Sequence, residues 1–165
     1  MKAQISFVEF ITAMTIFIGA ATYISFQVSS FMPNYINEVR SQRLRSEAFQ
    51  ISELLINDPG YPIDWYKGSF DNVKKIGLSD ETKNKTNLIS GIKLSSFFSN
   101  CSRVREKLDV DYNFLISFKN ITGSITGNCI SQTQAQRAIN ITIVRVVAYV
   151  EGNEIRYGEL MVQVW

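Results

Sequence analysis

The chain opens with a long apolar stretch that carries almost no charge. Residues 10–37 include no Asp, Glu, Lys or Arg. A helix needs ~20 predominantly apolar residues to cross a bilayer, so this stretch predicts a membrane-spanning helix. The small residues Gly19, Ala20 and Ala21 would let two such helices approach closely, and they are equally typical of membrane helices in general.

The next stretch predicts a second, amphipathic part of the same helix. Proline disfavours the helical conformation of the residue before it, so Pro33 predicts a kink or break at Met32. Over residues 34–57 apolar side chains recur mostly every three or four positions, with a slip between Val39 and Leu44. They are Ile36, Val39, Leu44, Ala48, Ile51 and Leu55. We expect the first part to lie in lipid and the second to pack on a domain.

The remainder predicts a small domain that contains a sheet. Proline and glycine in Asp58-Pro59-Gly60 should end the helix, with Tyr61 and Trp65 packed at the edge of the core. Short helices are expected at 92–98 and 104–108, a loop at 79–90, and a loop or short irregular hairpin at 120–137. Apolar and polar residues alternate over 112–119, which is the period of a half-buried strand.

The clearest pair of strands lies at the end of the chain. Segments 139–150 and 155–165 flank Glu151-Gly152-Asn153-Glu154, a tight-turn sequence that predicts a hairpin. The first segment is apolar nearly throughout and should be a central strand facing the long helix, with Arg145 and Arg156 at the surface. The pattern therefore predicts an α+β fold, in which a long N-terminal helix packs on a C-terminal antiparallel sheet.

Composition narrows the range of functions. The 165 residues include 17 Lys and Arg against 15 Asp and Glu, so the net charge of +2 gives no reason to expect a nucleic-acid partner. Histidine, the commonest general base and metal ligand, does not occur in the sequence. Asp109 and Asp111 could hold a cation but have no further acidic residue nearby. We expect no catalytic site, no metal and no cofactor, and the chain is not predicted to be an enzyme.

The first ten residues resemble a known signal. The segment Lys2-Ala3-Gln4-Ile5-Ser6-Phe7-Val8-Glu9-Phe10 is similar to the class III signal peptide of archaeal type IV pilins and pilin-like proteins. That signal has a short basic leader, then Gln, often a Ser two residues later, and an acidic residue at the start of a long apolar helix. In the family, a membrane-embedded prepilin peptidase cuts before the Gln. The resemblance implies cleavage between Ala3 and Gln4.

The resemblance also implies a role and a division of the chain. Residues 1–3 would be the leader, 4–32 the helix of the membrane and filament core, 33–57 its amphipathic second half, and 58–165 an extracellular type IV pilin-like head. The chain would be a major or minor structural subunit of a surface filament. Its partners would be sister subunits, the membrane and the peptidase, and Glu9 would serve assembly. The family's acid is commonly the fifth residue of the mature chain, whereas Glu9 would be the sixth.

A second segment carries a resemblance of its own. The turn Pro59-Gly60-Tyr61-Pro62, followed by Trp65 and by residues 72–78, is similar to a pattern in archaeal pilin-like surface proteins.

Two alternatives remain open at the level of sequence. The same leader would suit a membrane-anchored surface protein that never polymerises. A conventional secretory signal cut after Ala21 would instead release a secreted binding domain. The single basic residue, Lys2, and the carboxylate of Glu9 within the apolar region both argue against the secretory signal.

If the head is extracellular, two further features of the sequence can be interpreted: the two cysteines and the N-glycosylation patterns. Cys101 and Cys129 allow one intramolecular pairing, and a disulfide is the expected state outside the cell. The N-glycosylation pattern occurs four times, at Asn84, Asn100, Asn120 and Asn140.

Overall fold

The computed structural model describes residues 2–80, 87–131, 139–152 and 154–165, with the backbone alone for residues 2–6. The chain divides into two compact units, Met1–Arg40 and Ser41–Trp165, which are described separately below. Helix α1 (Lys2–Asn57) contributes to both. Its first part makes up the described part of the first unit, and its last part belongs to the second unit, the head.

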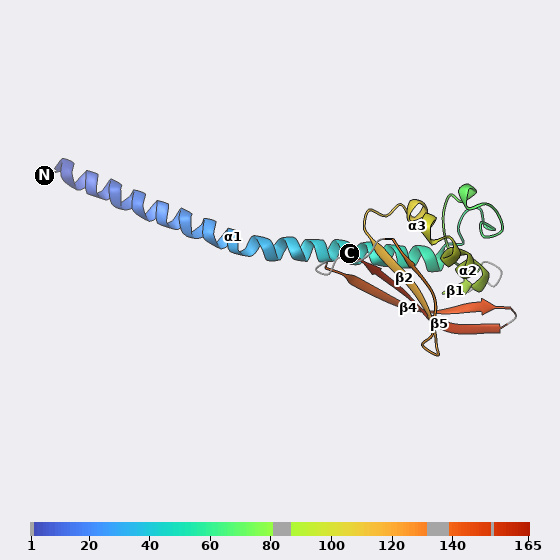
Figure 1. The fold of residues 1–165 in the computed structure, drawn as a ribbon. Coiled ribbons are helices and arrows are strands. Elements are labelled where there is room, and N and C mark those ends of the chain that lie inside the picture. Colours follow the sequence, from blue (N-terminus) through green and yellow to red (C-terminus); the bar gives the residue numbers. More distant parts are fainter. Residues whose placement is uncertain (1, 81–86, 132–138, 153) are drawn as a thin grey trace. The chain divides into compact units, whose positions relative to one another are not determined.

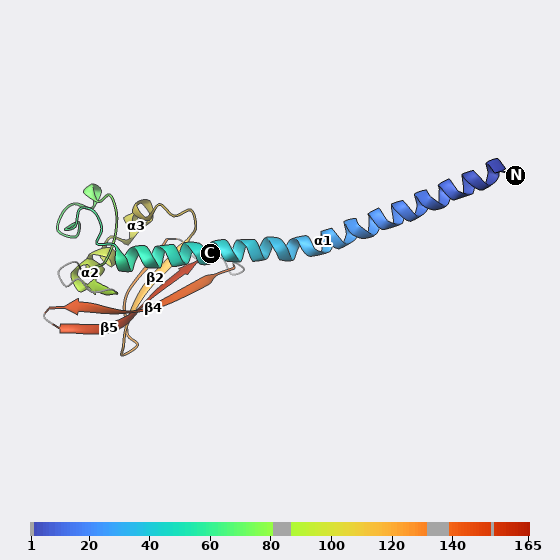
Figure 2. The same cartoon turned by 180° about the vertical axis from the view of Figure 1, so that it is seen from behind.

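Helix α1 is continuous through Pro33 (Figures 1 and 2). Of the kink or break expected at Met32, the break is therefore wrong. A proline inside a helix removes one backbone donor, whereas the turns on either side keep their own hydrogen bonds. Such a loss is tolerated in long apolar helices, where the rest of the ladder stays satisfied.

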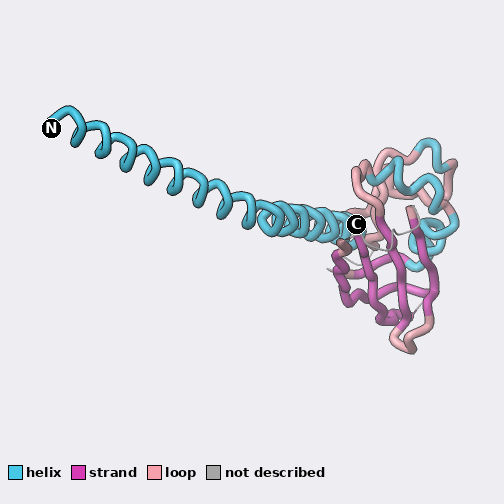
Figure 3. The backbone as a smooth tube through the Cα atoms, turned by 60° about the vertical axis from the view of Figure 1, so that its left-hand side comes forward, coloured by secondary structure: helices cyan, strands magenta, loops and turns pink. Residues whose placement is uncertain are grey.

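The head combines short helices with a single sheet (Figure 3). After α1 come a 3-10 turn (Phe70–Asn72), β1 (Leu88–Ser90), α2 (Gly91–Ser99) and α3 (Cys101–Leu108). The strands β2 (Phe114–Asn120), β3 (Ile125–Ile130), β4 (Ile141–Glu151) and β5 (Glu154–Val164) follow. The sheet order is β1-β4-β5-β2-β3, and all pairs except β1–β4 are antiparallel. The predicted α+β arrangement is confirmed, as are the two short helices and the terminal hairpin.

The last turns of α1 and one face of the sheet share the core. Leu44, Ala48, Ile51 and Leu55 are fully or almost fully buried, as their spacing predicts. The buried face of the sheet consists mainly of Phe114, Ile116, Phe118, Val147, Tyr149, Leu160, Val162 and Val164. These residues alternate with outward-facing ones along each strand, because successive side chains of a strand point to opposite faces.

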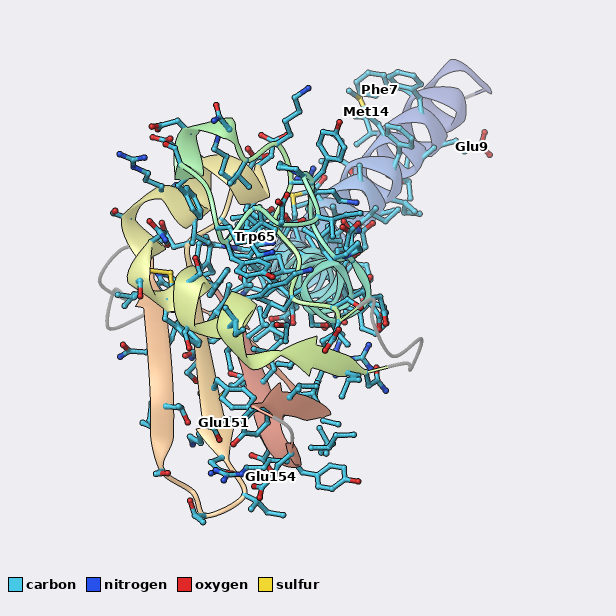
Figure 4. The ribbon with its side chains drawn as sticks, turned by 90° about the vertical axis from the view of Figure 1, so that its right-hand side faces the viewer. Phe7, Glu9, Met14, Trp65, Glu151 and Glu154 are labelled. Atoms are coloured by element: carbon cyan, nitrogen blue, oxygen red, sulfur yellow. A yellow bond between two sulfur atoms is a disulfide. The ribbon has the colours of Figure 1, made fainter. Side chains whose placement is uncertain are left out.

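Trp65 anchors the turn that follows α1 (Figure 4). Its side chain is 2% exposed, and its Nε1 donates a hydrogen bond to the Gly77 carbonyl at 3.0 Å. Gly77 must be glycine, because a Cβ there would lie 1.9 Å from the Asp58 carbonyl oxygen. Trp65 thus packs as expected, whereas the expectation for Tyr61 is wrong because its side chain is largely exposed.

The sheet departs from expectation in three places. Strand β4 is not central along its whole length, because β1 pairs only with Ala148, Tyr149 and Val150. Strand β1 forms at the end of the expected loop 79–90, whereas β3 pairs with β2 through a shifted register, as the irregular-hairpin alternative for 120–137 predicts. Arg145 is only partly exposed, because it faces α1 and forms an ion pair with Glu53.

Candidate functional site

The largest unusual surface of the molecule is the apolar segment of α1, residues 7–39. Its large side chains are exposed on every side of the helix, and Phe17 is 73% exposed. By length and composition this helix can cross a membrane, with a mean hydropathy of 1.7 over its most apolar window. At 1.5 Å per residue the segment measures roughly 50 Å, against ~30 Å of hydrocarbon in a bilayer. Its apolar surface is therefore longer than one membrane crossing requires.

Six polar side chains within this segment form hydrogen bonds inside the helix itself. The hydroxyls of Thr12, Thr15, Thr22, Ser25 and Ser30 each donate to the carbonyl four residues earlier, at 2.7–2.9 Å. Gln27 donates to the Tyr23 hydroxyl at 2.9 Å. Such bonds remove donors that would otherwise be costly to bury. The segment is thus suited to an environment without water.

Glu9 differs from these six residues because its side chain is charged. Its carboxylate is exposed and points away from Phe7 and Met14, which lie on another side of the helix (Figure 4). None of the described side chains of the first unit forms an ion pair or hydrogen bond with it. Ala3 and Gln4 lie within α1, in the part described by backbone alone. A carboxylate placed in an apolar environment costs ~2.5–3.5 kcal/mol on insertion scales, which favours a partner from another molecule.

A shallow apolar groove lies further along the same helix. It has a volume of about 430 Å³ and is lined by Tyr23, Ile24, Gln27, Val28, Phe31, Met32 and Tyr35. The groove is formed by a single helix, so its other wall must come from lipid or from another chain.

The head carries the predicted disulfide. Cys101 at the start of α3 is bonded to Cys129 on β3, with the two Cα atoms 5.3 Å apart. The bond ties the helical layer to the last strand of the sheet order. This confirms the predicted pairing of the two cysteines.

The predicted glycosylation positions differ in their surroundings. Asn140 is exposed one residue before β4, and Asn120 ends β2 with its side-chain oxygen accepting from the Ile121 amide at 2.7 Å. Asn100 lies between α2 and α3, and its amide donates to the Ser96 carbonyl. Asn84 falls outside the described residues. The acceptor pattern remains a prediction at all four.

The far end of the β4–β5 hairpin is polar (Figure 4). Arg156 forms ion pairs with Glu151 and Glu154, and its pKa is raised first by the hydrogen bond to Glu154 and then by the charge of Glu151. The strand residues Tyr149, Glu151 and Arg156 help line a shallow pocket of about 330 Å³ beside α2. Across the described ranges, no three His, Cys, Asp or Glu side chains form a group that could hold a metal, and Asp109 and Asp111 are exposed.

Two structural side chains were not predicted from the sequence. Lys93 on α2 is 5% exposed, and its ammonium donates to the carbonyls of Pro59 and Ser79 at 2.8 and 3.0 Å. It therefore fastens α2 to the turn after α1. Arg145 pairs with Glu53 and covers the ring of Phe49 at 4.9 Å. Neither arrangement has a local sequence signal, because the partners lie far apart in the chain.

Comparison with known protein families, with curated proteins and with solved structures gives no match to this chain. The candidate site is therefore defined by its own geometry: an exposed apolar helix with the carboxylate of Glu9 near its start, attached to a folded, disulfide-bonded head.

Proposed function

We propose that this chain is a structural subunit of an archaeal type IV pilus-like surface filament. It would be cut by a prepilin peptidase between Ala3 and Gln4 and held in the membrane by α1, with its head outside the cell. Assembly would then move the apolar segment from lipid into a bundle of sister helices. This role needs no catalytic chemistry, cofactor or nucleic-acid partner.

The observation that carries the proposal is the exposed apolar surface of residues 7–39 in one continuous helix with the buried face 44–55. Apolar surface of this extent requires cover. Lipid covers about 20 residues, and packing against sister helices would cover the rest. The groove beside Phe31 and Tyr35 lies in the later part of the segment and offers room for a neighbouring side chain.

Glu9 has a specific part in this proposal. Cleavage before Gln4 would create a new amino group near the start of the apolar helix. In the bundle, the Glu9 carboxylate of one subunit would pair with that amine of a neighbour, which would offset the cost of burying either charge alone. Changing Glu9→Gln should then reduce the amount of assembled filament, and unchanged assembly would show that the pairing is wrong.

The second candidate is a membrane-anchored surface protein that does not polymerise. The same leader and the same apolar helix would serve it, so a processed N-terminus alone does not distinguish the two. The length of the apolar surface favours the filament, because an anchor needs only the part that crosses the bilayer.

Intact and N-terminal mass analysis of the native protein tests the proposal. The chain should begin at Gln4 in both the membrane fraction and the sheared-surface fraction. The same start found only in membranes would favour the anchored protein. A chain beginning near Thr22 in the medium would overturn both and point to secretion.

A further inference from the structure

Among the described residues, one edge of the head's sheet has no strand beside it over most of its length. Strand β4 pairs with β5 along its whole length without a shift, but on its other side β1 reaches only Ala148, Tyr149 and Val150. Over residues 141–147, no described strand lies against that side. The segment has no Lys, Pro or Gly to discourage pairing, and its one charge, Arg145, is turned inward to Glu53.

The backbone groups of this edge point outward. Asn113 and Trp165 exchange both backbone hydrogen bonds, so the odd-numbered residues of β5 direct their N–H and C=O groups toward β2 and the even-numbered ones toward β4. It follows that Thr142, Val144 and Val146 direct their N–H and C=O groups away from β5. The Ala148 amide, next in this series, bonds to the Asn87 carbonyl on that side at 3.0 Å. The side chains of Val144 and Val146 are 52% and 69% exposed.

In the part of the chain that the structure describes, β3 is the strand at the other edge of the same sheet. It pairs with β2 alone and contains no charged residue. A bulge beside Thr126 limits its regular part to residues 127–130, where Asn128 and Ile130 direct their backbone groups away from β2. The Ile130 carbonyl lies 3.9 Å from the Cys101 sulfur, so Asn128 offers the more open backbone groups. A groove of about 420 Å³ lies along this edge, between α2 and residues 126–128 of the strand, so there is room for another chain.

The geometry points to pairing of the β4 edge of one subunit with the β3 edge of the next. Strands β4 and β3 run in opposite directions within the sheet, as the succession of antiparallel pairs requires. Two heads of the same orientation, placed side by side, would therefore join through an antiparallel ladder. The outward residues of both strands also have their side chains on the same face, away from α1, so the pleat continues across the contact.

The occupant is a second copy because the two edges match one another. Both edges have uncharged residues on their open side, and both open stretches are short. The two strands run in opposite directions, as an antiparallel pair requires. A contact between two different edges is head-to-tail and can repeat without limit, which a filament needs. Pairing of β4 with β4 would instead require heads of opposite orientation and would close after two copies. The inference rests on the proposed function only where it prefers a repeating β4–β3 contact to a closed β4–β4 dimer.

Cysteine cross-linking tests the contact in the full chain. Val144→Cys and Asn128→Cys in the same chain should give dimers, trimers and longer products when sheared filaments are oxidised, with the new link mapped to peptides containing 144 and 128. Backbone-bonded antiparallel pairs have Cα atoms ≈ 5.5 Å apart, within reach of a disulfide. The matched control is Tyr157→Cys with Asn128→Cys, because Tyr157 has the same outer face but lies on β5, one strand from the edge.

The outcomes separate this inference from the proposed function. Filaments that sediment normally without the longer products would overturn the pairing and leave the filament proposal intact. Dimers from Val144→Cys alone would overturn it in favour of β4–β4 contact. If the unmodified chain makes no filaments, the filament proposal fails. Long cross-linked products in the membrane would then still support the pairing, and their absence there would overturn it too.

A second pair of variants tests the edge without new cysteines. Val146→Lys puts a charge on the open edge, where lysine blocks pairing of sheets. Tyr157→Lys puts the same charge on the same face one strand further in. Sheared filaments should be lost with Val146→Lys and kept with Tyr157→Lys, while the thermal unfolding of both heads in detergent stays as in the unmodified chain. Equal filament yields from the two variants would contradict the pairing.

Discussion

The two parts of helix α1 have opposite surroundings. In residues 7–39 apolar side chains occupy every side of the helix and are exposed. In residues 41–57 most of them lie on the face that carries Leu44, Ala48, Ile51 and Leu55, which is buried in the head, whereas Phe49 lies outside that face and is 48% exposed. An amphipathic helix is covered by its own domain, whereas a helix that is apolar all round needs cover from outside. Residues 41–57 are therefore part of the fold of the head, whereas residues 7–39 need lipid or another chain to cover them.

A charge placed in the apolar segment should have the largest effect. Phe17→Asp adds a carboxylate to the middle of the segment, at a cost of ~2.5–3.5 kcal/mol on insertion scales. We expect loss of the chain from both membrane and sheared fractions, measured by immunoblot, because insertion precedes assembly. Phe17→Leu is the control and should behave as the unmodified chain. Normal filament yield from Phe17→Asp would contradict an apolar environment at this position.

A cavity in the buried part should affect the head and only the head. Leu55 is fully buried, so Leu55→Ala should lower the free energy of unfolding by about 3–5 kcal/mol. Phe17→Ala removes a larger side chain from the exposed part and should leave head unfolding unchanged. Both can be measured by denaturant titration of the detergent-solubilised protein. Equal losses would mean that the two parts of the helix do not differ as described.

The disulfide should stabilise the head by a comparable amount. Replacing Cys101 and Cys129 together with Ala opens a loop with a sequence separation of 28. The chain-entropy model then predicts a loss of roughly 3.5 kcal/mol. Denaturant titration of the double variant, compared with the unmodified protein under oxidising conditions, measures it. An unchanged denaturant midpoint would show that the disulfide does not stabilise the head by reducing the conformational entropy of the unfolded chain.

The ion pair between α1 and β4 should contribute least. The side chains of Glu53 and Arg145 are each about one-third exposed, so solvent weakens their attraction. Glu53→Gln should cost less than about 1 kcal/mol, and added salt should reduce the difference. Glu106→Gln, on the exposed surface of α3, is the control. A loss of several kcal/mol would place this pair in a far drier environment than its exposure indicates.

Much of this contrast was predictable from the pattern of residues. The spacing of Leu44, Ala48, Ile51 and Leu55 identified the buried face, and the slip between Val39 and Leu44 lies next to the boundary between the two units. The terminal hairpin was predicted from its turn, and the pairing of the two cysteines from their number and the expected compartment. The helix face and the hairpin follow from local periodicity and turn residues, and two cysteines allow only one pairing, so each could be predicted from the sequence alone.

Other features depend on contacts between distant segments. The sequence of β3 is rich in polar and small residues, and its strand conformation comes from pairing with β2. The apolar character of β4 suggested a central strand, but the order of strands depends on the three-residue β1 that covers only its end. Lys93 and Arg145 likewise contact partners on other elements, so neither pairing could be predicted from the neighbouring sequence.

Photocross-linking from position 17 tests the central claim most directly. A benzoylphenylalanine in place of Phe17 reports what touches the apolar segment, since that side chain is among the most exposed of the segment. In sheared filaments we expect covalent links to α1 of sister subunits, mapped by mass spectrometry. Cross-links confined to lipid, from filaments that sediment normally, would contradict the claim that sister helices cover this surface.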